Sequence, residues 1–266
     1  MSDPRSRTTL LRSLAIQRRV LHALLLREMI TRFGRDNIGV LWLVGEPLVF
    51  TLGVTALWTM ADLHHGSSLP IVAFAITGYS SVLLWRTAVA RCISGIPQNT
   101  GLLYHRNVRV LDVFAARILL EIAGASASFA VLGLVFVALE SIAPPTDLLK
   151  VLAGWAMLAW FGAALALLVG AASSYSPLIE RLWHPASYLL FPLSGAAFMV
   201  EWLPEPAREL VLLLPMVHGV EFVREGWFGN AVRTHHDLGY MAAANLALTW
   251  SGLFITRDAA WRVRHQ

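Results

Sequence analysis

Apolar residues dominate long, separate stretches of the chain. A helix that spans a bilayer needs about 20 mostly apolar residues. The stretches that satisfy this requirement cover residues 38–60, 69–90, 113–139, 149–172 and 240–256. A further apolar region, 185–200, is shorter and contains Pro192 and Gly195. This pattern predicts an all-α fold class: a polytopic membrane protein with six transmembrane helices.

A polar break follows the shortest of these regions. Residues 201–206 read Glu-Trp-Leu-Pro-Glu-Pro, and the next short apolar run ends at Pro215. Irregular backbone at membrane depth is tolerated only where protein or a water-filled path surrounds it. Short apolar segments broken by proline are therefore typical of transport pathways. We predict a re-entrant hairpin at about 201–215, between spans 5 and 6, within a transmembrane domain of residues 37–266.

The first 36 residues differ from the rest, because leucines and arginines alternate there at helical spacing. Leu10, Leu14, Leu21 and Leu25 fall on one face of a helix over residues 10–30. Such a pattern is typical of an amphipathic helix lying in the membrane interface. An ordinary helix packed on the spans is the alternative. We expect residues 1–36 to form a cytoplasmic N-terminus with this interface helix.

Composition excludes a water-soluble globule. Hydrophobic residues make up 56% of the 266 residues and charged residues only 14%, with a mean hydropathy of +0.60. Soluble domains carry about 25% charged residues. The net charge of +4 reflects topology, because a cytoplasmic N-terminus would leave only four of the 21 basic residues on the outer side. Those four are Lys150, Arg208, Arg224 and Arg233. Both termini are therefore predicted to be cytoplasmic, and no nucleic-acid partner is needed.

ATP binding is expected on another chain. A phosphate-binding loop of the Walker type needs Gly-Lys-Ser/Thr, whereas Lys150 is the only lysine and Val151 follows it. Cys92 is the only cysteine, which excludes an intramolecular disulfide and a thiolate metal cluster. The histidine pairs at 64–65 and 235–236 are interpreted as solvated loop residues rather than metal ligands. We expect no metal, cofactor or catalytic residue on this chain.

Three segments resemble type-2 ABC exporter permeases, and most closely the capsular polysaccharide export permeases. The first, residues 27–48, contains Arg-Glu, Gly-x-x-Trp and Glu-Pro at the start of the first span. Residues 99–121 resemble the loop between the second and third spans of that family. Residues 213–229 resemble the segment after its re-entrant hairpin, although Leu214 stands where the family usually has asparagine.

The resemblance implies a membrane subunit of an ATP-driven exporter in the bacterial inner membrane. It further implies a second copy of the chain, two ATPase subunits carrying ATP and magnesium, and a lipid-linked acidic polysaccharide as substrate. A periplasmic adaptor and an outer-membrane exporter are also implied. An O-antigen, teichoic-acid or small-molecule permease is the nearest alternative. An integral membrane glycosyl- or acyltransferase is the alternative from a different functional class.

The loop between the second and third spans is expected to couple the permease to its ATPase. It carries a short helix candidate, Ile96–Tyr104, followed by a basic stretch that ends at Arg109. A simple anchor to anionic lipid is the alternative interpretation. The predicted ATPase-coupling residues are Ile96, Tyr104, His105, Arg106, Asn107 and Arg109, together with Glu180 and Arg181 in the second cytoplasmic turn.

Several residues within the spans are candidates for the translocation path. Trp42 and Glu46 are four residues apart and share a helical face; an ionisable residue inside a span is a functional hypothesis by default. A hydrogen-bonded glutamate that fixes helix packing is equally plausible. The aromatic candidates, whose rings suit sugar surfaces, are Tyr79, Trp85, Trp155, Trp160, Phe161 and Tyr188. A place in the aromatic belt at the membrane interface is the alternative.

Charged residues give two further hypotheses. Arg86, Arg91 and Arg117 could form a cationic entrance for an acidic polymer, whereas an ion pair between Arg117 and Glu121 is the simpler interpretation of their i, i+4 spacing. In the other region, His218 and Glu221 lie at helical spacing with Arg224 and Glu225. They form either a polar cluster at the outer gate or an exposed charged face.

Overall fold

The computed structural model describes residues 10–33, 39–60, 69–103 and 108–265, and within these ranges the chain forms helices and no strand. The long helices are α1 (Leu10–Phe33), α2 (Gly39–Met60), α3 (Ile71–Ile93), α5 (Val110–Ala138), α6 (Leu148–Ala172), α7 (Pro177–Leu193), α9 (Pro215–Phe228) and α10 (Leu238–His265). The short ones are η1 (Pro97–Asn99), α4 (Thr100–Leu103), η2 (Val200–Trp202), α8 (Glu205–Val211) and η3 (Gly229–Ala231).

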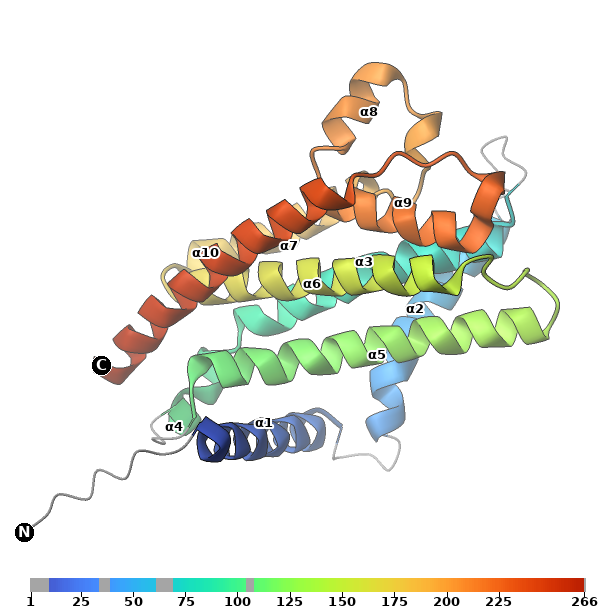
Figure 1. Cartoon of the computed structure of the whole chain (residues 1–266). Helices are drawn as coiled ribbons and strands as arrows, with labels where there is room; N and C mark the ends of the chain where they lie inside the picture. Colours follow the sequence, from blue (N-terminus) through green and yellow to red (C-terminus); the bar gives the residue numbers. More distant parts are fainter. Residues whose placement is uncertain (1–9, 34–38, 61–68, 104–107, 266) are drawn as a thin grey trace, which may run out of the picture.

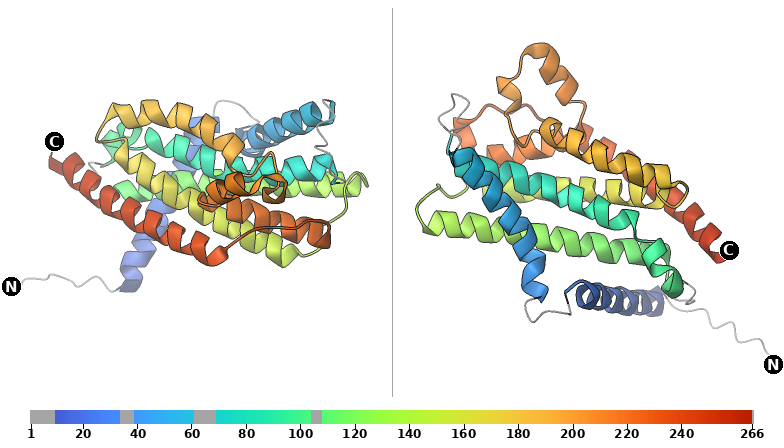
Figure 2. Two further views of the ribbon diagram at one scale, coloured as in Figure 1. Left: turned by 90° about the horizontal axis from the view of Figure 1, so that it is seen from above. Right: turned by 180° about the vertical axis from the view of Figure 1, so that it is seen from behind.

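Helices α3, α5 and α6 run alongside one another and form the centre of the bundle (Figure 1). Helices α9 and α10 pack on α6, and α2 packs on α3 and α5. Helix α1 lies across the direction of α5, near the end of the bundle where α5 begins and α10 ends (Figure 2). We call this end the α1 end. Helix α9 leads toward the opposite end, the α9 end, and α8 projects from the side of the bundle.

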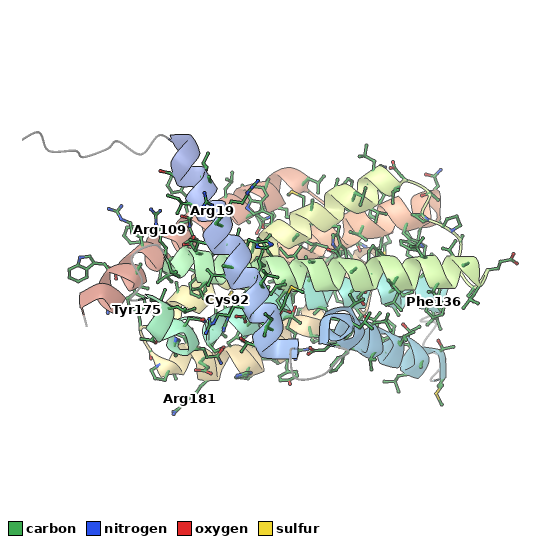
Figure 3. All side chains as sticks on the ribbon, turned by 90° about the horizontal axis from the view of Figure 1, so that it is seen from below. Arg19, Cys92, Arg109, Phe136, Tyr175 and Arg181 are labelled. Carbon is green, nitrogen blue, oxygen red and sulfur yellow. The ribbon has the colours of Figure 1, made fainter. Side chains whose placement is uncertain are left out.

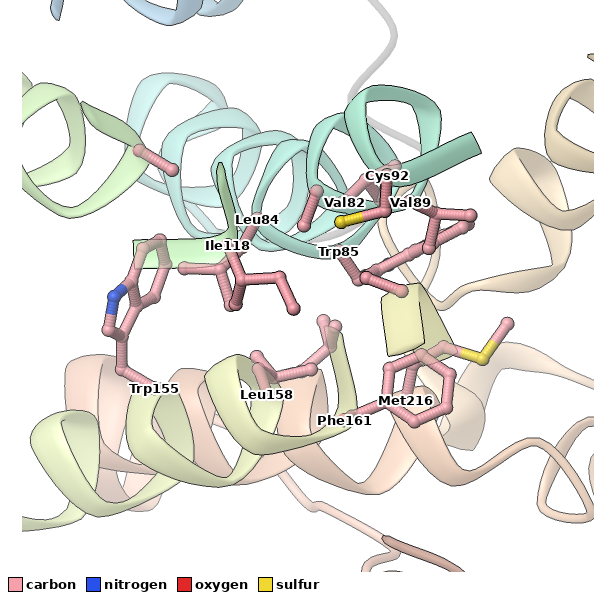
Figure 4. Packing of buried hydrophobic residues seen from close by; sticks show 14 of the residues in the cluster. Val82, Leu84, Trp85, Val89, Cys92, Ile118, Trp155, Leu158, Phe161 and Met216 are labelled. Atoms are coloured by element: carbon pink, nitrogen blue, oxygen red, sulfur yellow. The ribbon is translucent and has the colours of Figure 1, made fainter. Parts of the chain in front are cut away.

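The contact between α3 and α6 is close because small residues lie in it. A Cβ atom on Gly170 would lie 2.7 Å from Cβ of Cys92, and one on Gly162 would lie 2.9 Å from Cα of Trp85. Glycine at these positions lets two helix backbones approach, as is common between helices in membranes. The fully buried Trp85 and Leu158 then fill the space beside them (Figure 4).

Helices long and apolar enough to cross a membrane are present, as the sequence predicts. By length and composition they are α3, α5, α6 and the Leu238–Arg262 part of α10. Helix α2 contributes a shorter apolar helical stretch, Val44–Met60. Five of the six predicted spans coincide with a helix, and the sixth, 185–200, overlaps one only in part, so apolar helices account for the hydrophobic excess of the chain.

The boundaries of one predicted span differ from the structure. The predicted range of 185–200 starts too late and ends too late, because α7 runs from Pro177 to Leu193. Ser176 caps its beginning, its side chain accepting a hydrogen bond from the backbone of Leu178 at 3.2 Å. The first turns are polar, so hydropathy alone did not reveal them. The helix ends before Gly195, whose φ of +81° is strained for other residues.

Helix α1 confirms the predicted N-terminal helix. Leu24 is buried, at 8% exposed, whereas Leu14 is 66% exposed. The helix packs against α5 and α2. Helix α1 is therefore packed on the bundle, as one interpretation predicts. It also presents exposed leucines, as expected of a helix in the membrane interface.

Candidate functional site

A buried arginine organises the α1 end of the bundle. Arg117 of α5 is 4% exposed, and its Nε lies 3.1 Å from a carboxylate oxygen of Glu28 in α1. Its Nη1 donates to the carbonyl of Arg91 at 2.6 Å, and its Nη2 donates to Oε1 of Gln98 at 2.7 Å. The guanidinium carries five donors in a planar fork, so this one side chain joins α5 to α1, to the end of α3 and to η1.

Arg91 of α3 continues the same group of charges. Its Nη2 lies 3.5 Å from Glu46 of α2, and its Nε lies 3.4 Å from Glu121 of α5. Glu46 is therefore paired with an arginine of the neighbouring helix. The side chains of Arg91 and Glu46 are 42% and 43% exposed, so this pair reaches the surface of the bundle. Arg117 and Glu121, one turn apart, each have a charged partner on another helix.

Helix α1 is fixed to this region by two more contacts. Arg27 donates to Oδ1 of Asn99 at 2.5 Å, and the amide of Asn99 donates to the carbonyl of Gly95 at 2.9 Å. Gln17 hydrogen-bonds to Asp112 near the start of α5. A cavity of about 350 Å³ lies among Arg27, Glu28, Arg91 and Arg117 and the polar residues around them. We call these residues, with Glu46 and Glu121, the α1–α5 cluster.

The α1–α5 cluster links several helices through charged and polar side chains. Its charges come from α1, α2, α3 and α5, and its amides come from Gln98 and Asn99 of η1. Removing one partner of a buried ion pair typically costs about 3–5 kcal/mol. A displacement of η1 would therefore disturb the hydrogen bonds that join it to α1 and α5.

The predicted coupling residues occupy different environments. Ile96 is 7% exposed and belongs to the core, so it anchors the segment rather than facing a partner. The predicted short helix is confirmed as η1 and α4. Arg109 is exposed at the start of α5, and Glu180 and Arg181 are exposed in the first turns of α7. Figure 3 shows Arg109 and Arg181 at the same end of the bundle. Tyr104, His105, Arg106 and Asn107 lie outside the described residues.

Three of the predicted path aromatics are packing residues. Tyr79 is 7% exposed and meets Phe191 edge-on at 5.6 Å between ring centroids. Trp85 is fully buried against Phe161 and Trp183. The indole nitrogen of Trp160 donates to Thr249 at 3.0 Å and so joins α6 to α10.

Tyr188 is the exposed exception among those aromatics. It is 66% exposed, and the guanidinium carbon of Arg86 lies 4.5 Å from its ring centroid. Arg86 belongs to α3 and Tyr188 to α7. The predicted path residues with substantial exposed surface are therefore Tyr188 and the pair of Glu46 with Arg91. The side chain of Trp42 lies outside the described residues.

Arg224 forms a second centre, on α9. Its side chain is fully buried and lies 3.7 Å from the ring centroid of Phe74. Nη1 donates to the carbonyls of Gly195 and Phe198, and Nη2 donates to that of Ala196, each at 2.6 Å. These carbonyls belong to the connection that follows α7, where regular hydrogen bonding has stopped. Arg224 therefore supplies the donors that this buried backbone needs.

Glu221 holds the connections on both sides of α9. One carboxylate oxygen accepts from the backbone of Val200 at 3.2 Å, and the other accepts from that of His235 at 3.1 Å. His218 acts similarly: its Nδ1 accepts from the backbone of Asp237 at 2.9 Å, and its Nε2 donates to the carbonyl of Leu212 at 2.8 Å. Together with Arg224 these residues form the α9 cluster.

Two sequence interpretations of this region are settled by burial. His218 is 4% exposed and Glu221 is fully buried, so the alternative of an exposed charged face is wrong. His235 and His236 lie in a loop, as predicted, and their side chains are 31% and 22% exposed, but each contacts a glutamate. His235 contacts Glu201 at 2.5 Å, and His236 lies 3.3 Å from Glu225. The spacing of charges along α9 indicated the cluster, whereas nothing local indicated the histidine contacts. Residues 64–65 lie outside the described part of the chain.

Comparison with known proteins gives consistent matches along the chain. The sequence model described as ABC-2 type transporter matches residues 19–228. The chain is 43% identical over 249 residues to the capsule polysaccharide export inner-membrane protein CtrC of Neisseria meningitidis, covering 94% of each chain. It is 43% identical to BexB of Haemophilus influenzae, which has the same description, covering 94% of this chain and 95% of BexB. The polysialic acid transport protein KpsM of Escherichia coli is 27% identical, covering 91% of this chain and 94% of KpsM.

Proposed function

The chain belongs to the ABC-2 type transporter family, and we propose that it is the permease subunit of an ATP-driven exporter of capsular polysaccharide in the bacterial inner membrane. The observation that carries this proposal is the identity of 43% to capsule polysaccharide export inner-membrane proteins over 94% of the chain. The chain is a permease rather than an enzyme, and ATP and magnesium bind to a separate ATPase chain. No cofactor is assigned to the permease itself.

We propose six spans, formed by α2, α3, α5, α6, α7 and α10, with both termini in the cytoplasm. The α1 end then faces the cytoplasm, as the distribution of arginines favours. Helix α7 has 17 residues and α9 has 14, which correspond to about 26 and 21 Å, against about 30 Å of hydrocarbon. Helix α9 is therefore too short to cross, whereas α7 lies at the lower limit of about 17–25 residues for a span. The segment around 201–215, with α9, is assigned to a re-entrant excursion held by the α9 cluster.

The exporter would contain two copies of the chain and two ATPase subunits. Helices α2, α3 and α7 lie side by side on one face (Figure 2, right). This face exposes the pair of Glu46 with Arg91 and the stack of Arg86 on Tyr188. Charged groups within spans almost always face protein or water rather than lipid. We assign this face to the translocation path, opposite the second copy.

Coupling would run through η1 and α4. Closure of the ATPase dimer would displace these short helices at the cytoplasmic face, with Glu180 and Arg181 of α7 as a second contact. Because Gln98 and Asn99 of η1 bond to Arg117 and Arg27, their movement reaches α5 and α1 directly. Arg91 then extends the effect to Glu46, on the path.

The substrate would be a lipid-linked acidic polysaccharide. Arg86 offers positive charge on the path, and the exposed ring of Tyr188 offers a surface on which a sugar can stack and slide. A periplasmic adaptor and an outer-membrane exporter would receive the polymer. These partners complete a route from the cytoplasm to the cell surface.

Reconstitution tests the function. The permease and its ATPase would be placed in liposomes with a labelled acidic glycan carrying its lipid, and ATP-dependent protection of the glycan would be measured. An ATPase whose ATP-loop lysine is replaced serves as the control and should abolish transport. Turnover of a glycosyl donor by the permease alone, without transport, would identify a transferase instead and contradict the proposal.

A further inference from the structure

A groove lies between the beginning of α5 and the last turns of α10, at the α1 end. Its volume is about 430 Å³, and it opens to the surface. Figure 3 shows Arg109, at the start of α5, at this end of the bundle. The residues that form most of the groove are Arg109, Leu111, Leu253, Arg257, Ala260 and Trp261. The groove is separate from both polar clusters.

Arg109 and Arg257 differ from Arg91, Arg117 and Arg262 at this end of the bundle. Within the described ranges, neither guanidinium lies in an ion pair, and Asp112 accepts from the backbone N–H of Arg109, at 2.9 Å, rather than from its side chain. Arg91 and Arg117 have carboxylate partners. Even the exposed Arg262 lies 3.3 Å from Asp258 and stacks on Tyr175 at 4.3 Å. Two cations on one groove without an acidic partner favour an anionic ligand.

The rest of the groove is apolar and continues along α10. Leu253 and Leu111 are each 39% exposed, and Trp261 is 61% exposed. Helical spacing places Leu253 on the same stripe as Leu246 and Trp250, which are 49% and 74% exposed. The stripe therefore ends in Arg257 and Trp261, so an apolar track leads into a positively charged site. Tryptophan is enriched where apolar and polar membrane regions meet.

We propose that this groove binds an anionic phospholipid. The headgroup phosphate accepts hydrogen bonds from the guanidiniums of Arg109 and Arg257, whose geometry suits phosphate oxygens. An acyl chain lies along the stripe of Leu253 and Trp250. Helices α5 and α10 touch each other at few points, and the lipid would bridge them. Because Arg109 ends the connection to α4, the lipid would also fix the start of α5.

Lipid binding to the purified full-length protein tests the proposal without any measurement of export. Phosphatidylglycerol or phosphatidylcholine would be titrated in mild detergent, the melting temperature followed, and retained lipids counted by native mass spectrometry. We expect phosphatidylglycerol to bind more tightly. A cation near the surface contributes about 1 kcal/mol toward anionic lipid, so R109Q or R257Q should weaken binding about fivefold, and the double variant more.

The variant R262Q is the matched control, because it removes the same charge from the same helix outside the groove. It should bind phosphatidylglycerol like the wild type. Equal weakening by R262Q, or unchanged binding by the double variant, would overturn the proposal. If inorganic phosphate alone raised the melting temperature as much as phosphatidylglycerol does, the groove would be a site for soluble anions instead. Displacement of the lipid by the purified ATPase would assign the groove to protein docking, and either result would also overturn the proposal.

Discussion

Replacing Arg117 by methionine tests whether the α1–α5 cluster holds α1 on the bundle. The change keeps most of the side-chain volume and removes the charge that faces Glu28. It also removes the donors that satisfy the carbonyl of Arg91 and the side-chain oxygen of Gln98. The side chains of Arg117 and Glu28 are 5% and 12% exposed, so solvent would compensate little for the loss.

The expected loss of stability in R117M follows from the burial of this ion pair. Breaking a buried ion pair from one side typically costs about 3–5 kcal/mol, whereas an exposed pair contributes about 0–1 kcal/mol. The pair of Arg262 with Asp258, whose side chains are 56% and 48% exposed, provides the exposed comparison. We expect R117M to lower the free energy of unfolding several times more than R262M.

A double-mutant cycle with Glu28→Gln separates the interaction energy between Arg117 and Glu28 from the contributions of their other neighbours. Unfolding would be followed in mild detergent for the wild type, R117M, E28Q and the double variant. Direct partners should show a coupling energy of about 0.5–3 kcal/mol. Additive effects would refute the pairing, and R117M as mild as R262M would refute the inference that the cluster is buried and structural. Export should fall with R117M even at equal membrane levels, because η1 loses its link to α5.

Three other changes probe the remaining features. R224M should abolish export and destabilise the protein by several kcal/mol, because three buried carbonyls lose their donor; limited proteolysis of the purified protein would detect the loosened connection after α7. G170L should prevent folding, because its Cβ atom would lie 2.7 Å from Cβ of Cys92. G53L should fold normally, because no atom lies within 4 Å of the Cβ position there. The yield of folded protein and its melting temperature would be measured for both variants. The hydrogen bond with His235 lowers the pKa of Glu201 in the folded protein. The ionised Glu201 therefore stabilises the fold above the ordinary pKa range of a carboxyl group. This stabilisation is lost as the pH falls through the lowered pKa. Melting curves against pH should show this loss in the wild type and not in E201Q.

Helix positions could be predicted from the sequence because a bilayer imposes one strong rule, a long apolar run for each span. Five of the six predicted spans coincide with a helix, and 185–200 overlaps α7 in part. The rule fails at α7, whose first turns carry Glu180 and Arg181 and whose start depends on Ser176 as a cap. A hydropathy pattern detects the apolar part of a helix and not its polar beginning.

The partners of charged and aromatic residues could not be predicted, because spacing describes one helix and the contacts join several. The i, i+4 pattern indicated Glu121 as the partner of Arg117, yet the three-dimensional arrangement brings Glu28 to it from α1. Trp85 and Tyr188 are both aromatic residues in apolar surroundings, and only packing shows that one is core and the other exposed. Burial within a bundle depends on neighbours far away in sequence.

The two buried arginines share a role that explains why each lies where it does. Arg117 donates to the carbonyl of Arg91 in the last turn of α3. Arg224 donates to the carbonyls that follow the end of α7. Carbonyls at a helix end lack partners within the helix, and the negative end of the helix dipole favours a cation there. Arg117 therefore replaces water at the buried end of α3, and Arg224 replaces it along the buried backbone that follows α7. Since α3 runs from Phe74, beneath Arg224, to Arg91, beside Arg117, one helix connects both arginines. A displacement of α3 along its axis would disturb both arginines together, so α3 is the helix that links the α1 end to the α9 end.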